Sequence, residues 1–166
     1  MKHIRRSRIT LTPIGFVRTK ATEQDFRKHR QDVVSEVVLN KEYAEGLRGI
    51  EDYSHLFVLF WLHKVGKSER KQILTHPKHR EDLPKVGIFS TRQRNHPNPI
   101  GLTVVRLLEH RSNVLKVKNL DAVDGSPVLD IKPYDDWDIP ATTRVPKWWK
   151  QTQKLPFSCP PRTKEG

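Results

Sequence analysis

The chain has 166 residues, a length that fits one ordinary domain or one domain with a tail. Its 31 basic and 19 acidic side chains give a formal net charge of +12, so a polyanion is the first class of partner to consider. Charged residues make up 30% of the chain, and no apolar run approaches the ~20 residues of a membrane span, which excludes a helical membrane protein. Four Trp and six Phe exclude a fully disordered chain.

The cysteine count and the first residues indicate the setting of the protein. One cysteine, Cys159, excludes an intramolecular disulfide framework and a multi-cysteine zinc site. The basic start of the chain lacks the apolar core of a signal peptide. We therefore expect a cytoplasmic protein that binds no metal.

The positive charge is concentrated in three blocks, residues 1–30, 64–96 and 144–166, which alternate with two mildly acidic, strand-rich blocks. Phosphate binding requires Lys and Arg spread over a surface, so this pattern favours nucleic acid as the partner. One alternative is a solvated surface on a generally basic protein. Another is an acidic membrane surface, although no long amphipathic helix supports it.

The apolar periodicity along the chain is mostly that of β-strands. Leu56–Leu62 is continuously apolar and predicts a strand buried on both faces. Residues 110–113 separate two strand-like runs and predict a hairpin turn. The predicted strands are Ile9–Arg18, Val33–Leu39, Leu56–Leu62, Val86–Ser90, Gly101–Leu108, Val114–Leu120 and Val128–Ile131. Several short strands separated by Gly and Pro turns predict a mainly β fold, a small barrel or a sandwich.

Helical patterns are short. One or two turns are predicted over Lys41–Leu47, a short helix over Ser68–Leu74 with Ser68 as its N-cap, and another over Val145–Gln153. From Pro156 onward the chain has three prolines and no periodicity, which predicts a Pro-rich tail. The expected organisation is a basic N-terminal extension (1–8), a barrel domain (9–140) and a C-terminal helix with the tail (141–166).

The segment Gly87–Leu102 holds the densest set of polar residues that could serve chemistry. Pro97 and Pro99 impose a stiff, extended path, which would hold Arg92 and Asn98 in place before a ligand arrives. A guanidinium suits a carboxylate or a phosphate. The alternative is a structural Pro-rich turn with incidental charges.

A second polar segment is Leu120–Asp130, where three aspartates lie among apolar residues. A carboxylate such as Asp121 could bind ribose hydroxyls or an ammonium group. The alternative is an Asx-type turn that closes a hairpin, which the Asp124–Pro127 sequence would support by itself.

Other familiar patterns are incomplete. His55 and His63 would share a face of one regular strand, but no third ligand makes a zinc site attractive. Residues 66–68 resemble the end of a phosphate-binding P-loop, yet Trp61 stands where the first glycine should be. Neither a dinucleotide-binding glycine pattern nor a nucleophile elbow is present.

Four motifs in order resemble one family. They are P-I-G-F-V-R (13–18), G-L-R-G-I-E-D-Y-S-H-L (46–56), G-I-F-S-T-R…H-P-N-P-I-G (87–101) and L-D-A-V-D-G-S-P-V-L-D-I-K-P-Y (120–134). Together they resemble the TsaA-like family, the S-adenosylmethionine-dependent tRNA (adenine-N6)-methyltransferases, over roughly Ile9 to Asp138. The resemblance implies a single-sheet β-barrel with short peripheral helices, a homodimer, and methylation of N6 of threonylcarbamoyladenosine at position 37 of tRNA.

The resemblance also implies a set of site residues. The S-adenosylmethionine site would comprise Arg30, Gln31, His63, Lys64, Arg92, Leu102, Leu120, Asp121, Ala122 and Val123. Apart from the resemblance, the residue types suggest Arg92, Asn98, His96 and Tyr134 for positioning the reactants, and the basic blocks suggest Lys67, Arg70, Lys71 and Arg94 for contacting tRNA phosphates. Two motifs depart from the family pattern: His96 replaces an arginine, and His29 precedes Arg30-Gln31 where many members have proline.

The chemistry expected of this set is positioning. The sulfonium activates its own methyl group, so no strong base is obligatory. An arginine would bind the methionine carboxylate, Asp121 the ribose hydroxyls or amino group, and the backbone of Leu120–Val123 the adenine edge. Two alternatives remain open: a non-catalytic RNA-binding β-barrel, and a methyltransferase of the same fold with another substrate. Binding of the cofactor separates the first alternative from an enzyme.

Overall fold

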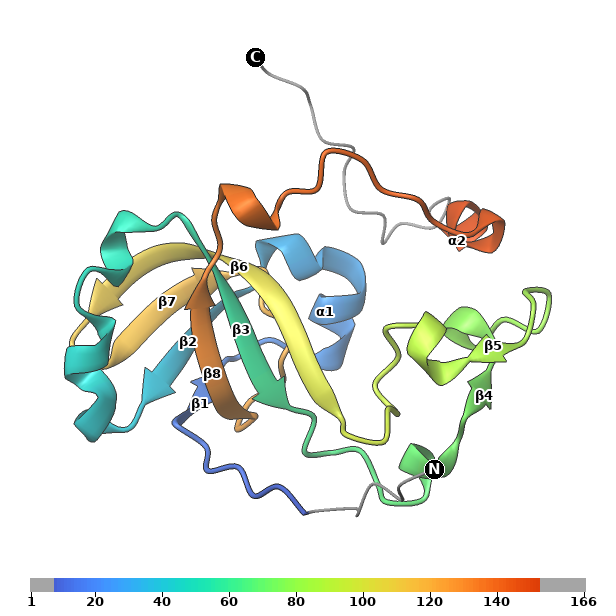
Figure 1. Cartoon of the computed structure of the whole chain (residues 1–166). Helices are drawn as coiled ribbons and strands as arrows, with labels where there is room; N and C mark the ends of the chain where they lie inside the picture. The colour runs from blue at the N-terminus through green and yellow to red at the C-terminus, as the bar shows by residue number, and fades with distance from the viewer. Residues whose placement is uncertain (1–7, 153–166) are drawn as a thin grey trace, which may run out of the picture.

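The computed structural model describes residues 8–152, in which six antiparallel strands close into one barrel (Figure 1). The spatial order is β1-β2-β7-β6-β3-β8, and β8 pairs with β1 to close the ring. The strands are β1 (Gly15–Arg18), β2 (Val34–Leu39), β3 (His55–Trp61), β6 (Ile100–Arg111), β7 (Val114–Lys118) and β8 (Pro127–Pro133). The predicted fold class, a mainly β single-sheet barrel with short peripheral helices, is confirmed. The predicted Pro-rich tail lies outside the described residues.

The barrel interior is filled by alternate side chains of its strands. In β3, Leu56, Val58 and Phe60 are buried in the core, whereas the residues between them are half-buried. The prediction of burial on both faces of this strand was therefore wrong, because a barrel strand has only one inner face. Gly101 on β6 lies against the ring of Phe60, where a Cβ atom would overlap the ring.

Strand β6 has a free edge at the start of its twelve residues. Over Ile100–Arg106 it pairs with β3, but it pairs with β7 only from Arg106 onward. Within the described residues, Ile100–Val105 thus has a strand partner on one side only. The predicted hairpin turn at 110–113 is narrower, because β6 continues to Arg111 and only Ser112 and Asn113 separate it from β7.

A helix that the sequence analysis did not predict, α1 (Glu23–His29), precedes β2. A capping box begins it: the side chain of Thr22 accepts a hydrogen bond from the backbone N–H of Asp25, and the Asp25 carboxylate accepts one from the N–H of Thr22. The charged composition of this segment hides the helix from a search for apolar periodicity. The 3₁₀ turn Arg30–Asp32 follows and carries Arg30 to the barrel.

A two-stranded sheet lies beside the barrel, to the right in Figure 1, and two predictions fail there. Its strands are β4 (Leu74–Thr75) and β5 (Val86–Gly87). The predicted helix Ser68–Leu74 is one 3₁₀ turn, Glu69–Lys71, because Ser68 makes no capping bond and the chain then extends to form β4. The predicted strand Val86–Ser90 ends at Gly87 and continues as a 3₁₀ turn.

The last described element is α2 (Lys147–Thr152), close to the predicted helix Val145–Gln153. Its C-terminal carbonyl, on Thr152, accepts a hydrogen bond from Lys78 Nζ at 3.1 Å, which joins it to the segment between β4 and β5. Over residues 8–152 no helix has the length and apolar character needed to cross a bilayer.

Candidate functional site

Side chains bind the carbonyl groups along the free edge of β6. Arg92 Nη2 donates to the carbonyl oxygen of Leu102 at 2.8 Å, and Asn119 Nδ2 donates to that of Val104 at 3.2 Å. Asn119 has the left-handed φ of 73°, and its own N–H donates to the carbonyl oxygen of Val33 at 3.0 Å. The chain that leaves β7 is thereby turned so that Leu120–Val123 lies next to the start of β6.

Asp121 is the centre of the polar contacts at this edge. Its Oδ2 lies 3.0 Å from Arg30 Nη1, and its Oδ1 accepts a hydrogen bond from the Thr103 hydroxyl. About a third of the Asp121 side chain remains exposed. A carboxylate has roughly four lone-pair positions, so each oxygen can still accept a hydrogen bond from a ligand. Arg30 Nε is buried and has no hydrogen-bond partner within the described chain.

The other predicted cofactor residues lie around the same end of the barrel. The N–H of Leu62 donates to the carbonyl oxygen of Pro99 at 2.8 Å, which joins the end of β3 to the loop before β6. His63 and Lys64 follow directly and are exposed. The structure thus places these residues, predicted from the sequence to bind the cofactor, around the start of β6: 30, 63–64, 92, 102 and 120–123.

The side chains in Leu120–Val123 differ in what they can offer a ligand. Leu120 and Ala122 are almost fully buried and belong to the core, so only their backbone groups can face outward. Val123 is half-buried, and Gln31 is exposed on its 3₁₀ turn. Contact between the backbone of this segment and the adenine edge stays a prediction.

The positioning candidates are not all brought together. Asn98 is exposed in the loop before β6, and His96 Nε2 lies 3.1 Å from the carbonyl oxygen of Thr91. Tyr134 instead packs edge-on against Phe57 and His55, with ring centroids 5.2 and 6.3 Å apart. Phe57 and His55 lie opposite Val104 and Arg106 on β6, whereas Arg92 binds the carbonyl oxygen of Leu102. Within the described residues no hydrogen bond joins Tyr134 to Arg92 or to Asp121.

The phosphate candidates divide into two kinds. Lys67 and Lys71 are exposed. Arg70 is half-buried: its guanidinium carbon lies 5.3 Å from the ring centroid of Trp61, and its Nη2 donates to the carbonyl oxygen of Val65 at 2.7 Å. Arg94 lies 3.4 Å from Glu69. Arg70 thus stabilises the end of β3, while the two lysines are available to a polyanion.

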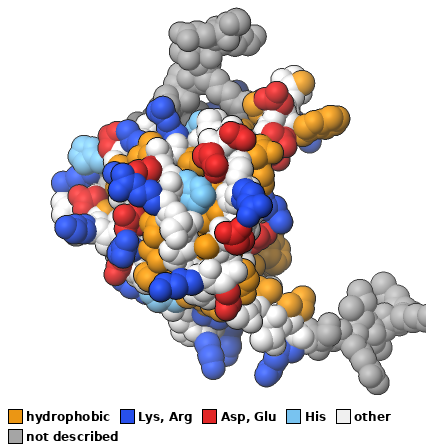
Figure 2. All heavy atoms as spheres, turned by 90° about the vertical axis from the view of Figure 1, so that its left-hand side faces the viewer, with side chains coloured by type: hydrophobic (Ala, Val, Ile, Leu, Met, Phe, Trp, Pro, Cys, Tyr) orange, Lys and Arg blue, Asp and Glu red, His pale blue; other side chains and the backbone are white. Residues whose placement is uncertain are grey.

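One face of the molecule is a poor candidate for a phosphate-binding surface. Figure 2 shows the left-hand side of Figure 1, where blue basic and red acidic side chains are interspersed. Ion pairs on this side of the barrel include Arg48 with Glu45 and Arg111 with Glu109. Charges neutralised within the protein leave little net attraction for a polyanion on this face.

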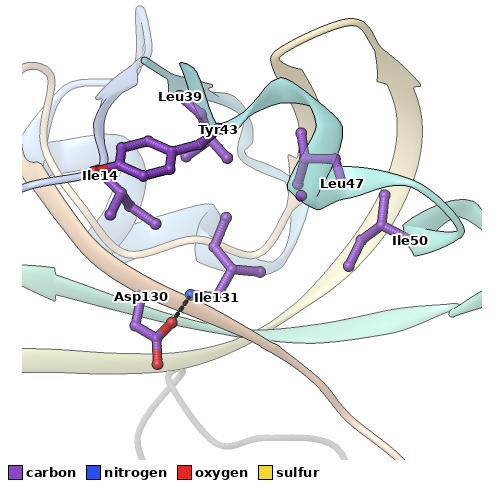
Figure 3. Close-up of a pocket in the computed structure, with 8 residues that line it drawn as sticks. Ile14, Leu39, Tyr43, Leu47, Ile50, Asp130 and Ile131 are labelled. Carbon is purple, nitrogen blue, oxygen red and sulfur yellow. Dashed lines mark hydrogen bonds between the residues drawn. The ribbon is translucent and has the colours of Figure 1, made fainter. Parts of the chain in front are cut away.

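A cavity of about 150 Å³ lies away from the predicted residues (Figure 3). Its lining is mostly apolar and includes Ile14, Leu47 and Ile50, with Tyr43 and Asp130. The Asp130 carboxylate is already engaged, because Oδ1 accepts from the N–H of Ile131 at 2.9 Å and Oδ2 lies 2.8 Å from Lys132 Nζ. The cavity therefore lacks the set of polar groups that a charged cofactor needs, and we place the candidate site at Asp121.

Sequence reasoning missed two residues that shape this site, Thr103 and Asn119. A polar residue at an inward position of the apolar run Gly101–Leu108 was the signal for Thr103. For Asn119 the signal was an asparagine at the end of a strand, since asparagine tolerates left-handed backbone.

The sequence profile described as the tRNA-methyltransferase O N-terminal domain matches residues 18–138. An S-adenosyl-L-methionine-binding protein of Archaeoglobus fulgidus is 43% identical over 127 residues, which cover 75% of this chain and 88% of that protein. The tRNA (adenine(37)-N6)-methyltransferase of Escherichia coli is 41% identical over 95 residues, which cover 55% of this chain and 40% of the enzyme.

The structural comparison agrees with the sequence comparison. The crystal structure of TrmO from Pseudomonas aeruginosa superposes with a TM-score of 0.66 at 30% identity, covering 83% of this chain and 62% of that one. This chain thus spans less than two thirds of that solved structure. The resemblance found in the motifs is confirmed, and the chain belongs to the tRNA-methyltransferase O N-terminal domain family.

Proposed function

We propose that this protein is an S-adenosylmethionine-dependent methyltransferase that acts on N6 of adenosine 37 in tRNA. The observation that carries the proposal is the Asp121 carboxylate, held by Arg30 and Thr103 beside the exposed Arg92 at the free edge of β6. Relatives named as S-adenosyl-L-methionine-binding proteins and as tRNA (adenine(37)-N6)-methyltransferases support both the cofactor and the substrate.

The residues present fit S-adenosylmethionine. Asp121 has free acceptor positions for ribose hydroxyls or the ammonium group, and the buried Arg30 Nε is a donor without a partner in the described chain. Arg92 uses one Nη for Leu102, and its other N–H groups can bind the methionine carboxylate. When bound, the cofactor supplies a methyl group already activated by the sulfonium, so the task of the protein is to orient the amine of the base in line with it.

Metal is not expected to take part. No group of three His, Cys, Asp or Glu side chains within residues 8–152 is arranged to hold an ion. For every proposed contact with the cofactor, the partner is an organic side chain or a backbone group. We therefore expect a chelator to leave cofactor binding and methyl transfer unchanged.

Substrate RNA is proposed to bind through the basic segment 64–96. Lys67 and Lys71 are exposed there and would contact phosphates. An anticodon-loop base is unpaired, so it can be splayed out toward the methyl group. His96 and Asn98, in the same segment or directly after it, are candidates for contacting that base.

The proposal extends to the modification carried by the substrate adenosine and to the oligomeric state of the protein. We propose that the accepted adenosine carries the threonylcarbamoyl group, on the strength of the family resemblance. A homodimer is proposed because exposed apolar side chains border the site: Phe89 is 78%, Leu102 46% and Ile100 41% exposed. A second copy would remove this surface from water. The cytoplasmic location stays a prediction from the sequence.

The central experiment is mass spectrometry of nucleosides from tRNA incubated with the protein and methyl-labelled S-adenosylmethionine. We expect label in N6-methylated threonylcarbamoyladenosine, and none when the tRNA lacks the threonylcarbamoyl group. Label on another nucleoside would indicate a methyltransferase with a different substrate. A protein that transfers no label, gives no heat of binding with S-adenosylmethionine and still binds tRNA would be a non-catalytic RNA-binding barrel.

The dimer is tested separately by sedimentation at the concentration used for the assay. We expect a species of twice the monomer mass and a loss of activity on dilution below its dissociation constant. An active monomer would contradict the homodimer while leaving the proposed reaction intact.

A further inference from the structure

Thr103 is a polar residue in an apolar interior. It is only 2% exposed, it lies on β6 opposite Val58, and the next inward residue on its strand is Val105. Valine has nearly the same shape and would bury no hydroxyl group in this position. A buried hydroxyl costs free energy unless it is hydrogen-bonded, and the partner of this one is the Asp121 carboxylate.

The two partners of Asp121 differ in how firmly they hold it. The side chain of Arg30 is 39% exposed, begins at a short 3₁₀ turn and has several rotatable bonds, so it constrains the carboxylate less than a short side chain would. Thr103 lies where β6 pairs with β3, and it has a β-branched side chain with few rotamers. The rigid partner therefore decides the direction of the carboxylate, and Arg30 supplies the compensating charge.

We propose that Thr103 is a positioning residue of the cofactor site, whose buried hydroxyl orients the Asp121 carboxylate toward the hydroxyl or ammonium donors of S-adenosylmethionine. The inference rests on the proposed function and adds a residue that the family motifs did not bring into the predicted site. Thr103 does not touch the cofactor. It acts on affinity through Asp121, because a freely rotating carboxylate must be ordered when the ligand binds.

The test uses three variants of the full chain and isothermal titration with S-adenosylmethionine. Thr103→Val keeps the shape and removes the hydroxyl, and we expect it to raise the dissociation constant about tenfold, the loss of one charge-assisted hydrogen bond. Thr103→Ser keeps the hydroxyl and is expected to stay within about twofold of the parent protein. Asp121→Ala removes the group that Thr103 orients and should weaken binding at least as much as Thr103→Val.

A double variant shows whether the effect passes through Asp121. In the Asp121→Ala background, Thr103→Val should cause no further loss of affinity. In Thr103→Val the KM for S-adenosylmethionine should rise in step with the dissociation constant for S-adenosylmethionine, whereas the dissociation constant for tRNA should not change, because the lost hydrogen bond is made to the group that faces the cofactor. Thermal unfolding of each variant checks the fold, and Thr103→Ala replaces Thr103→Val in the same comparisons if the latter does not fold.

The outcomes separate the two levels of the proposal. Three results would overturn the role of Thr103. The first is a Thr103→Val variant that binds S-adenosylmethionine as tightly as the parent protein, and the second is a Thr103→Ser variant that binds it as weakly as Thr103→Val. The third is a Thr103→Val change that lowers the affinity as much in the Asp121→Ala background as in the parent protein. In those cases the parent protein still binds the cofactor, so the proposed function stands. A parent protein that gives no heat with S-adenosylmethionine overturns both.

Discussion

Nη1 of Arg30 lies 3.0 Å from Oδ2 of Asp121, and this ion pair joins the turn after α1 to the segment that leaves β7. Neither residue is deeply buried, so the pair adds little to the stability of the fold. It places a positive charge next to the Asp121 carboxylate at the free edge of β6. We therefore expect this ion pair to contribute more to ligand binding at the site than to the stability of the barrel.

Replacing Arg30 with alanine is expected to weaken S-adenosylmethionine binding about tenfold, because Asp121 would lose its charged partner and the site its spare Nε donor. Titration calorimetry measures the change. Lys28→Ala is the matched control, since it removes an exposed positive charge from the adjacent helix α1. Equal losses in both variants would show a general charge effect and contradict a specific role for Arg30.

Arg92→Ala is expected to reduce the free energy of cofactor binding by about 2–3 kcal/mol, the value of a lost charge-assisted contact. Its effect on the free energy of unfolding should be smaller, because the side chain is exposed and, within residues 8–152, makes one hydrogen bond, to Leu102. Calorimetry and urea unfolding of the same preparation compare the two. A variant that unfolds readily yet binds the cofactor normally would show that Arg92 is structural.

Lys67→Ala and Lys71→Ala should each weaken tRNA binding and lower the slope of log affinity against log salt by about 0.7–0.9, one phosphate contact per lysine. Cofactor affinity should not change. Lys116→Ala, an exposed lysine on the outer face of β7, is the control and should leave the slope unaltered. Slopes identical for all three variants would mean that the basic segment 64–96 is only a solvated surface.

The capping box of α1 makes the stability of this helix depend on pH. The pKa of Asp25 is lowered by hydrogen bonds from the backbone N–H and the hydroxyl of Thr22. A lowered pKa means that this carboxylate stabilises the folded state above its ordinary value of 3.8, and that the contribution is lost as pH falls through the folded pKa.

We expect the free energy of unfolding to fall less between neutral pH and pH 3 in Asp25→Asn than in the parent protein. Thermal unfolding across this range is the measurement. At pH 7 the variant should be less stable than the parent protein, and below pH 3.8 the two should converge. Parallel curves would show that Asp25 makes no pH-dependent contribution to the helix.

Local patterns in the sequence predicted the barrel strands and one turn. Alternating apolar residues predict barrel strands because every second side chain must enter the core, and six of the seven predicted strands overlap barrel strands. The interpretation of Asp124–Pro127 as a turn is supported as well: Gly125 has the left-handed φ of 74°, and the N–H of Ser126 donates to the carbonyl oxygen of Val123 at 3.1 Å. These features depend on residues that are neighbours in the chain.

Tertiary structure alone decided which polar residues meet. Arg30, Thr103 and Asp121 come from three distant segments, and no local periodicity specifies their contact. Closure of the barrel left β6 half-paired and so created the edge on which they gather. The same closure packed Tyr134 against Phe57 and His55 of β3, whereas Arg92 binds β6 at Leu102, although the motifs indicate both residues for one site. The sequence thus determined the strands and the residue types, whereas the strand register, a long-range property, determined which of those residues share a site.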